Sequence, residues 1–188
     1  MDERVTQSLW ENSKYFIGAL GEPCRESHAL HFPLKKELPF ASFRIRYGVE
    51  NKFLGKIYVM LLEGKFAGTR GCNGSDSIEL RYSGFLRKGT PSFVPVSAKG
   101  GKGKKDAILR LLNENQTLIE RCWKLDIESL KLSFDPAEKV WTLLLRPFGG
   151  SYIYVMFPPM RYNVILVRDQ ADLLLSMMEQ IARLLGNF

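Results

Sequence analysis

The chain has 188 residues, of which 45% are hydrophobic and 25% charged, a composition that excludes a disordered chain and fits one globular domain. Lysine and arginine outnumber aspartate and glutamate by 27 to 20, so the formal net charge is +7. This charge favours nucleic acid, anionic lipid headgroups or acidic proteins as partners. No apolar run is long enough to cross a bilayer, so we expect that the protein is not an integral membrane protein.

The cell compartment follows from two further features of the sequence. The amino-terminal residues carry charges of both signs and lack the apolar segment of a signal peptide. The three cysteines lie at wide, unpatterned spacing, which is typical of reduced thiols rather than of a disulfide framework. We therefore expect a cytoplasmic protein.

Residues 1–39 are predicted to form a helix followed by an irregular segment. Apolar residues between Val5 and Leu20 fall mostly on one helical stripe, and Gly21 and Pro23 end the helix. The residues from Cys24 to Pro39 show no clear periodicity, and prolines interrupt them.

Residues 40–125 are predicted to contain four strands and then a helix. The stretch "FRIRYGV" alternates between apolar and polar residues, which indicates a half-buried strand with Arg44 and Arg46 on the solvent side. "GKIYVMLLEGK" is apolar on both faces, "SIELRYSGFLRK" alternates again, and "SFVPV" is a short edge strand because Pro95 cannot donate to a ladder. A helix is expected from about Asp106 to Lys124.

The same order of elements recurs in residues 127–186, which predicts an internal duplication. "LKLSFDPAEKVWTLLLRPFGG" matches the first two strands in pattern, and "QADLLLSMMEQ" matches "KKDAILRLLNE", which pairs Asp106 with Asp172. The predicted fold class is α+β: duplicated ββββα units form one antiparallel sheet with helices on one face, plus an N-terminal helix, in a single domain over residues 1–188. This pattern resembles the saddle of the TATA-box-binding-protein fold in architecture. No motif of that family is present, so the resemblance carries no function.

The second half of the chain is similar to a known protein family. The stretch "LLRPFGGSYIYVMFPPMRYNVIL", together with the preceding "LNENQTLIERCWKLD", resembles a small bacterial family known only as a domain of unknown function. The resemblance implies a bacterial origin and supplies no catalytic residue.

The middle strands are apolar on both faces, although a sheet with one solvated face should alternate. One set of side chains must face the two predicted repeat helices, so something else must cover the other set. The N-terminal helix, a second subunit, or a bound apolar ligand or peptide could each provide that cover. The candidate ligand-binding residues on these strands are Tyr58, Met60, Trp141, Tyr152, Tyr154 and Met156.

A basic loop precedes the first repeat helix in "VSAKGGKGKKDAILRLL". Its glycines free backbone N–H groups at a helix N-terminus, which is chemistry suited to phosphate, yet the loop departs from the P-loop pattern. The second unit has only "VRDQAD" at this junction, so we interpret the loop first as a solvated insertion and second as a phosphate site. The candidate anion-binding residues are Lys99, Lys102, Lys104, Lys105, Arg44 and Arg46.

Metal and catalytic motifs are weak in this sequence. Cys24, His28 and His31 invite a metal interpretation, but their spacing matches no zinc pattern and a fourth ligand is missing. Both histidines lie in that one segment, and no nucleophile motif such as G-x-S-x-G occurs. We therefore expect neither a metal nor a cofactor.

Three hypotheses about function follow, in this order. The first is a non-enzymatic binding protein. It would engage an apolar ligand or peptide on the sheet face, or an anionic partner such as nucleic acid at a basic patch formed by the candidate anion-binding residues. The second is a structural or regulatory homodimer whose interface is the apolar sheet face. The third is an enzyme that acts on a phosphorylated or acyl substrate.

Overall fold

The computed structural model describes residues 3–26, 28–34, 37–68, 77–84, 89–96 and 102–186, with the side chains of 102–106 left out. In this part of the chain it is an α+β protein with four helices and one ten-stranded antiparallel sheet, which confirms the predicted fold class. The elements are α1 (Glu3–Leu20), β1 (Cys24–Glu26), β2 (Ala29–Phe32), β3 (Ser42–Lys52), β4 (Gly55–Ala67), β5 (Ser77–Tyr82), β6 (Pro91–Pro95), α2 (Lys102–Glu114), α3 (Gln116–Lys124), β7 (Ile127–Asp135), β8 (Val140–Pro147), β9 (Tyr152–Val155), β10 (Met160–Asn163) and α4 (Arg168–Gly186).

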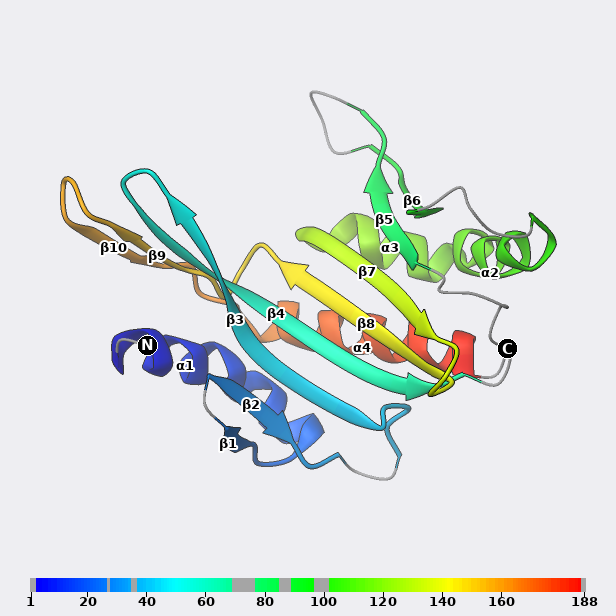
Figure 1. Cartoon of the computed structure of the whole chain (residues 1–188), viewed down its shortest axis with the longest axis horizontal. Coiled ribbons are helices and arrows are strands. Elements are labelled where there is room, and N and C mark those ends of the chain that lie inside the picture. The colour runs from blue at the N-terminus through cyan, green and yellow to red at the C-terminus, as the bar shows by residue number, and fades with distance from the viewer. Residues whose placement is uncertain are drawn as a thin grey trace.

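The long strand β4 organises the sheet. The strand order is β1-β2-β3-β4-β8-β7-β5-β6, and β9 with its partner β10 also joins β4. The first residues of β4, Gly55–Tyr58, pair with β9, whereas its last residues, Leu62–Ala67, pair with β8. As a result the β3–β4 and β9–β10 hairpins leave the body of the sheet together, on the same side of the molecule (Figure 1).

The core lies on one face of the sheet. Cross-strand partners share a face, and the row Ile45, Leu62, Leu145 and Leu130 runs across β3, β4, β8 and β7 with all four side chains at 0% exposure. The helices cover this face: α1 contacts β3 and α4, α4 contacts β4, and α3 packs beside α4. Figure 1 shows α1 behind β3 and α4 behind β4 and β8.

The N-terminal helix is therefore part of the core layer. Val5, Leu9, Phe16 and Leu20 are buried along one side of α1 and belong to the same apolar cluster as the strands. In the described part of the chain, none of the helices is long and apolar enough to span a membrane.

Two segments differ from the elements expected from the sequence. The residues after Pro23 form the short β1–β2 hairpin, which extends the sheet by pairing β2 with β3. The single helix expected from about Asp106 to Lys124 is two helices, α2 and α3. Asn115 separates them because its side chain accepts a hydrogen bond from the Leu118 N–H at 3.0 Å and so caps a new helix.

The two predicted repeats correspond in their first hairpin but differ in how their second hairpin pairs with the rest of the sheet. The β3–β4 and β7–β8 hairpins meet at the antiparallel β4–β8 pair, and helices follow in each half. The β5–β6 hairpin pairs with β7 of the other half, whereas β9 of the β9–β10 hairpin pairs with β4. Internal duplication stays a prediction; the arrangement of the first hairpins supports it, and that of the second hairpins does not.

Candidate functional site

The six aromatic and apolar candidates occupy two different places. Met60, Trp141 and Tyr152 are 0%, 2% and 7% exposed and belong to the helix-covered core. Tyr58 is half-buried between the rings of Tyr47 and Tyr152, with ring centroids 6.2 and 6.1 Å away. These four side chains therefore pack in or against the core and do not line a site for a ligand or a second subunit.

The other two candidates lie outside the core proper. The half-buried Tyr154 ring of β9 carries the Arg161 guanidinium 5.6 Å above its centroid. Met156 follows β9 in an exposed turn. These two side chains belong to the projecting end of the β9–β10 hairpin.

The arginine candidates lie on the uncovered face of the sheet, as their alternation with core residues predicts. Arg44 forms an ion pair with Glu63 at 2.8 Å, and the Arg46 Nε lies 4.0 Å from the same carboxylate. Glu63 is only 7% exposed, so its charge depends on these two neighbours. Both arginines are therefore engaged with an internal carboxylate.

The basic loop lies mostly outside the described residues. Lys99 is not described, and Lys102, Lys104 and Lys105 are placed only as backbone in the first turns of α2. The structure brings none of the four lysines to a described site with Arg44 and Arg46.

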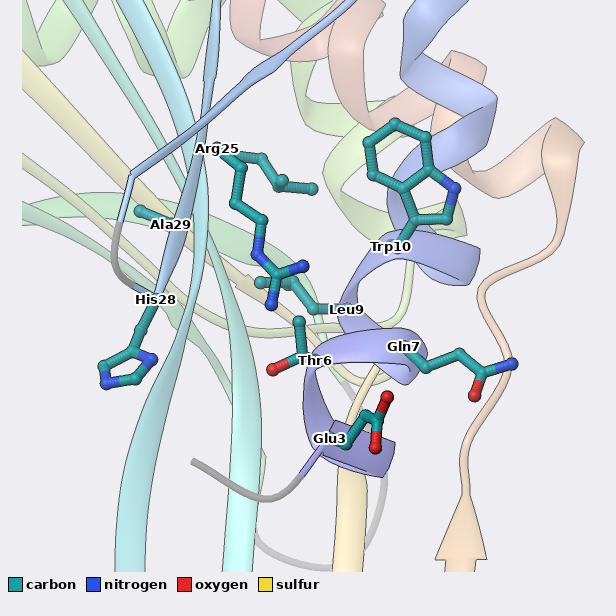
Figure 2. A pocket seen from close by; sticks show the side chains of 9 residues that line it. Glu3, Thr6, Gln7, Leu9, Trp10, Arg25, His28 and Ala29 are labelled. Atoms are coloured by element: carbon teal, nitrogen blue, oxygen red, sulfur yellow. The ribbon is translucent and has the colours of Figure 1, made fainter.

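A pocket of about 390 Å³ lies between α1 and the β1–β2 hairpin. This volume is within the usual range for small-molecule sites. Figure 2 shows α1 on one side of the pocket and Arg25, His28 and Ala29 on the other. The lining residues are Glu3, Thr6, Gln7, Leu9, Trp10, Arg25, His28, Ala29 and Leu30.

Local geometry explains how these side chains come together. Glu3, Thr6, Gln7 and Trp10 follow helical spacing, so they form one stripe of α1. On the other wall, Arg25 pairs with Leu30 in the β1–β2 register and so shares its face. Leu30 in turn pairs with the buried Ile45.

The consequence is an arginine that points to the helix side from an edge strand. In Figure 2 the Arg25 side chain extends from β1 toward α1, whose Leu9 and Thr6 line the same pocket. The floor of the pocket is apolar because Leu9 and Leu30 are each 3% exposed. Trp10 supplies an exposed aromatic wall.

The polar groups of this pocket have hydrogen-bonding capacity to spare. Within the described part of the chain, neither the Arg25 side chain nor the Glu3 side chain forms a hydrogen bond or ion pair. A wider depression between α2, α3 and α4, of about 550 Å³, differs in this respect. There Arg121 already donates to the Ser176 carbonyl and hydroxyl and to Gln180. The pocket beside α1 is therefore the better candidate for a ligand.

The described residues contain no cluster of side chains that could hold a metal ion. Cys24 and His31 are cross-strand partners, and His28 lines the pocket in the turn between the two strands. His31 contacts Glu26 at 3.4 Å. No group of three or more histidine, cysteine, aspartate or glutamate residues assembles in the part of the chain that the structure describes.

A buried polar network fixes α1 against the sheet, and the sequence analysis did not anticipate it. Asn12 accepts from the Leu166 N–H at 2.8 Å and donates to the Asn163 side chain at 3.2 Å. Ser8 lies 3.0 Å from the Tyr47 hydroxyl, which donates to the Gly150 carbonyl at 2.9 Å. Burial raises the pKa of Tyr47, so this hydroxyl stays protonated as a donor. The network holds the α1 wall of the pocket in place.

The comparisons with known proteins identify a family and give no function. A family model described as "Protein of unknown function (DUF3156)" matches residues 17–185. The chain belongs to this family, as the resemblance of its second half indicated. No curated protein and no solved structure matches the chain, so the likeness to the TATA-box-binding-protein saddle is not confirmed. The β1–β2 wall of the pocket lies within the matched range, and its α1 wall precedes it.

Proposed function

We propose that this protein is a non-enzymatic binding protein whose pocket between α1 and β1–β2 takes an apolar small molecule with an anionic group. The observation that carries the proposal is the Arg25 guanidinium, which has no partner in the described structure and extends over an apolar pocket floor. An apolar pocket with a few convergent polar groups is the usual form of a ligand site.

The chemistry of the lining assigns a place to each end of such a ligand. Leu9, Trp10 and Leu30 would contact the apolar body, which removes its surface from water. Arg25 would donate charge-assisted hydrogen bonds to a carboxylate, and its planar group suits two such bonds. Glu3 lies in the first turn of α1 and would repel an anion there, so the carboxylate is directed to the β1 side.

The lining supports binding better than catalysis. General acid–base or nucleophilic catalysis requires a base within hydrogen-bonding reach of the group that it activates. His28 is exposed, and no hydrogen bond connects it to another lining residue in the described structure. This arrangement favours the binding hypothesis over the enzyme hypothesis.

The test compares three probes with the same apolar chain and different head groups. Decanoate, decanol and decylammonium are titrated into the full chain below their micellar range, and binding is followed by calorimetry. We expect decanoate to bind best and decylammonium worst, because Arg25 favours the anion. Equal affinity for the three probes, or preference for the cation, would contradict the role of Arg25.

Single substitutions locate the site. Arg25→Gln should weaken decanoate binding by about tenfold, the effect of one charge-assisted hydrogen bond, and leave decanol binding unchanged. Arg110→Gln, which removes an exposed arginine from α2, is the matched control and should change neither affinity. If both substitutions weaken decanoate equally, the attraction comes from net charge and not from the pocket.

A further inference from the structure

Two hairpin tips project side by side from the body of the protein. Residues 53–54 turn between β3 and β4, and residues 156–159 turn between β9 and β10; we call these two turns the paired tips. The Met156 N–H donates to the Leu54 carbonyl at 2.7 Å, which joins the two turns directly. A Cβ atom on Gly55 would lie 2.1 Å from the Tyr154 carbonyl oxygen, so glycine permits this close approach. Figure 1 shows both hairpins extending beyond the helices.

The paired tips expose apolar side chains that a water-facing turn would not require. Phe53 is 95% exposed and Phe157 is 76% exposed, and both occupy the turns themselves. Leu54, Met156 and Met160 are also exposed beside them. Exposed apolar residues are ordinary when scattered, but a contiguous group on adjacent turns marks an interaction site.

Cationic and aromatic side chains surround the apolar turns. Lys52, Lys56 and Arg161 lie on the strands directly behind the tips, and Glu50 is the acidic residue among 49–56 and 152–163, so these segments carry 3 − 1 = +2. Glu50 pairs with Lys52 at 3.0 Å and with Arg146 of β8, so its charge is already compensated. Lys56 and Arg161 contact no carboxylate in the described structure, and Arg161 lies over the Tyr154 ring.

We propose that the paired tips dock the protein on an anionic lipid bilayer. The apolar turns would enter the boundary between headgroups and acyl chains, where buried apolar area determines binding strength. The lysines and the arginine would remain at headgroup level, where anionic lipids attract them, and the tyrosines behind the turns match the interfacial preference of that side chain. A protruding apolar end with cations behind it fits a soft anionic surface, and the net charge of +7 acts in the same direction. This inference does not depend on the pocket beside α1.

The experiment measures co-sedimentation of the full chain with vesicles. One set contains phosphatidylcholine alone, and the other contains phosphatidylcholine with a minority of phosphatidylglycerol. We expect binding to the anionic vesicles that declines with added salt, and little binding to the neutral ones. The double variant Phe53→Ser/Phe157→Ser should lose at least tenfold in partitioning, because it removes the largest apolar area of the tips.

The contribution of charge is tested with a triple variant that neutralises the three cations behind the paired tips. Lys52→Gln/Lys56→Gln/Arg161→Gln should weaken binding on the order of a hundredfold, at about fivefold for each cation at the membrane surface. The control Arg110→Gln/Lys124→Gln/Lys131→Gln removes the same net charge from exposed positions on α2, α3 and β7. The control should lose far less, because its cations lie away from the tips.

A second control distinguishes insertion of the paired tips from non-specific adsorption of exposed aromatic side chains to vesicles. Phe148→Ser/Trp123→Ser removes two exposed aromatic side chains, 66% and 56% exposed, that lie outside the paired tips, and it should bind vesicles like the wild type. Circular dichroism should show every variant folded, since all these side chains are exposed. The proposal is overturned if both double variants bind like the wild type, or if both are weakened equally. It is also overturned if the tip variant changes only self-association in sedimentation velocity, which would make the tips a contact between copies of this chain.

Discussion

Apolar side chains in the middle of the sheet are buried in the core, whereas apolar side chains at its margins are exposed to water. In the middle, Trp141 and Met60 are enclosed by strands and helices. At the margins, Phe53 and Phe157 face water from the paired tips, and Trp10 faces it from the α1 pocket. The most hydrophobic strands therefore form the core, and the surfaces available for binding lie where strands and helices end.

The largest expected difference between the two regions is in stability. Trp141→Ala removes a fully enclosed ring and should lower the free energy of unfolding by about 3–5 kcal/mol. Phe53→Ala removes a ring that the fold hardly contacts and should change it by less than about 0.5 kcal/mol. Urea denaturation of both variants checks this contrast. Similar losses for the two substitutions would show that the paired tips pack against something that the structure does not place there.

The buried polar network should show the next largest effect. Asn12→Ala leaves the buried Leu166 N–H without its acceptor and removes one of the two donors to the Asn163 side-chain oxygen, the other being Ser8. This loss should cost about 1–3 kcal/mol in the free energy of unfolding. Gln7→Ala removes an exposed amide of the same helix that donates to the Glu11 carboxylate at 3.0 Å, and should change stability little. An Asn12→Ala variant as stable as the wild type would indicate that α1 is held by apolar packing alone.

The smallest expected effect is the pH dependence that comes from Glu50. Hydrogen bonds from Lys52 and Arg146 hold the pKa of this carboxyl below its ordinary value of 4.5. Because the folded pKa is the lower one, the stabilisation is present above pH 4.5 and is lost as the pH falls through the folded value. Glu50→Gln should therefore flatten the decline of urea stability on the acid side of pH 4.5. Solvent screening keeps the change small, and an unchanged acid slope would show that these ion pairs contribute nothing.

Much of the fold was predictable because its main strands carry their own pattern. The alternation in "FRIRYGV" correctly placed Ile45 toward the core and Arg44 toward the open face. The continuous apolar runs of β4 and β8 correctly indicated strands, and both strands are central in the sheet. The α1 stripe predicted the helix and its buried side.

The parts that were not predicted depend on contacts between distant segments. The β1–β2 hairpin has strands of 3 and 4 residues, too short for a periodic signal, and its register is set by pairing with β3. The pocket arises only where this hairpin meets α1, so nothing near Arg25 in the sequence signals a ligand. The paired tips likewise depend on the β4–β9 contact, which joins residues about a hundred positions apart. The exposed Phe53 and Phe157 beside turn residues were the signal that the sequence did offer.

The most direct measurement of the central claim is a chemical-shift map of the full chain titrated with decanoate. We expect the backbone amide signals that move to cluster on Thr6, Trp10, Arg25 and Leu30, which line the pocket from its two walls. The same titration of the Arg25→Gln variant should shift these signals only at higher decanoate concentration. Shifts confined to the paired tips or to the depression beside Arg121, with the α1 and β1–β2 signals unmoved, would contradict the assignment of the pocket as the ligand site.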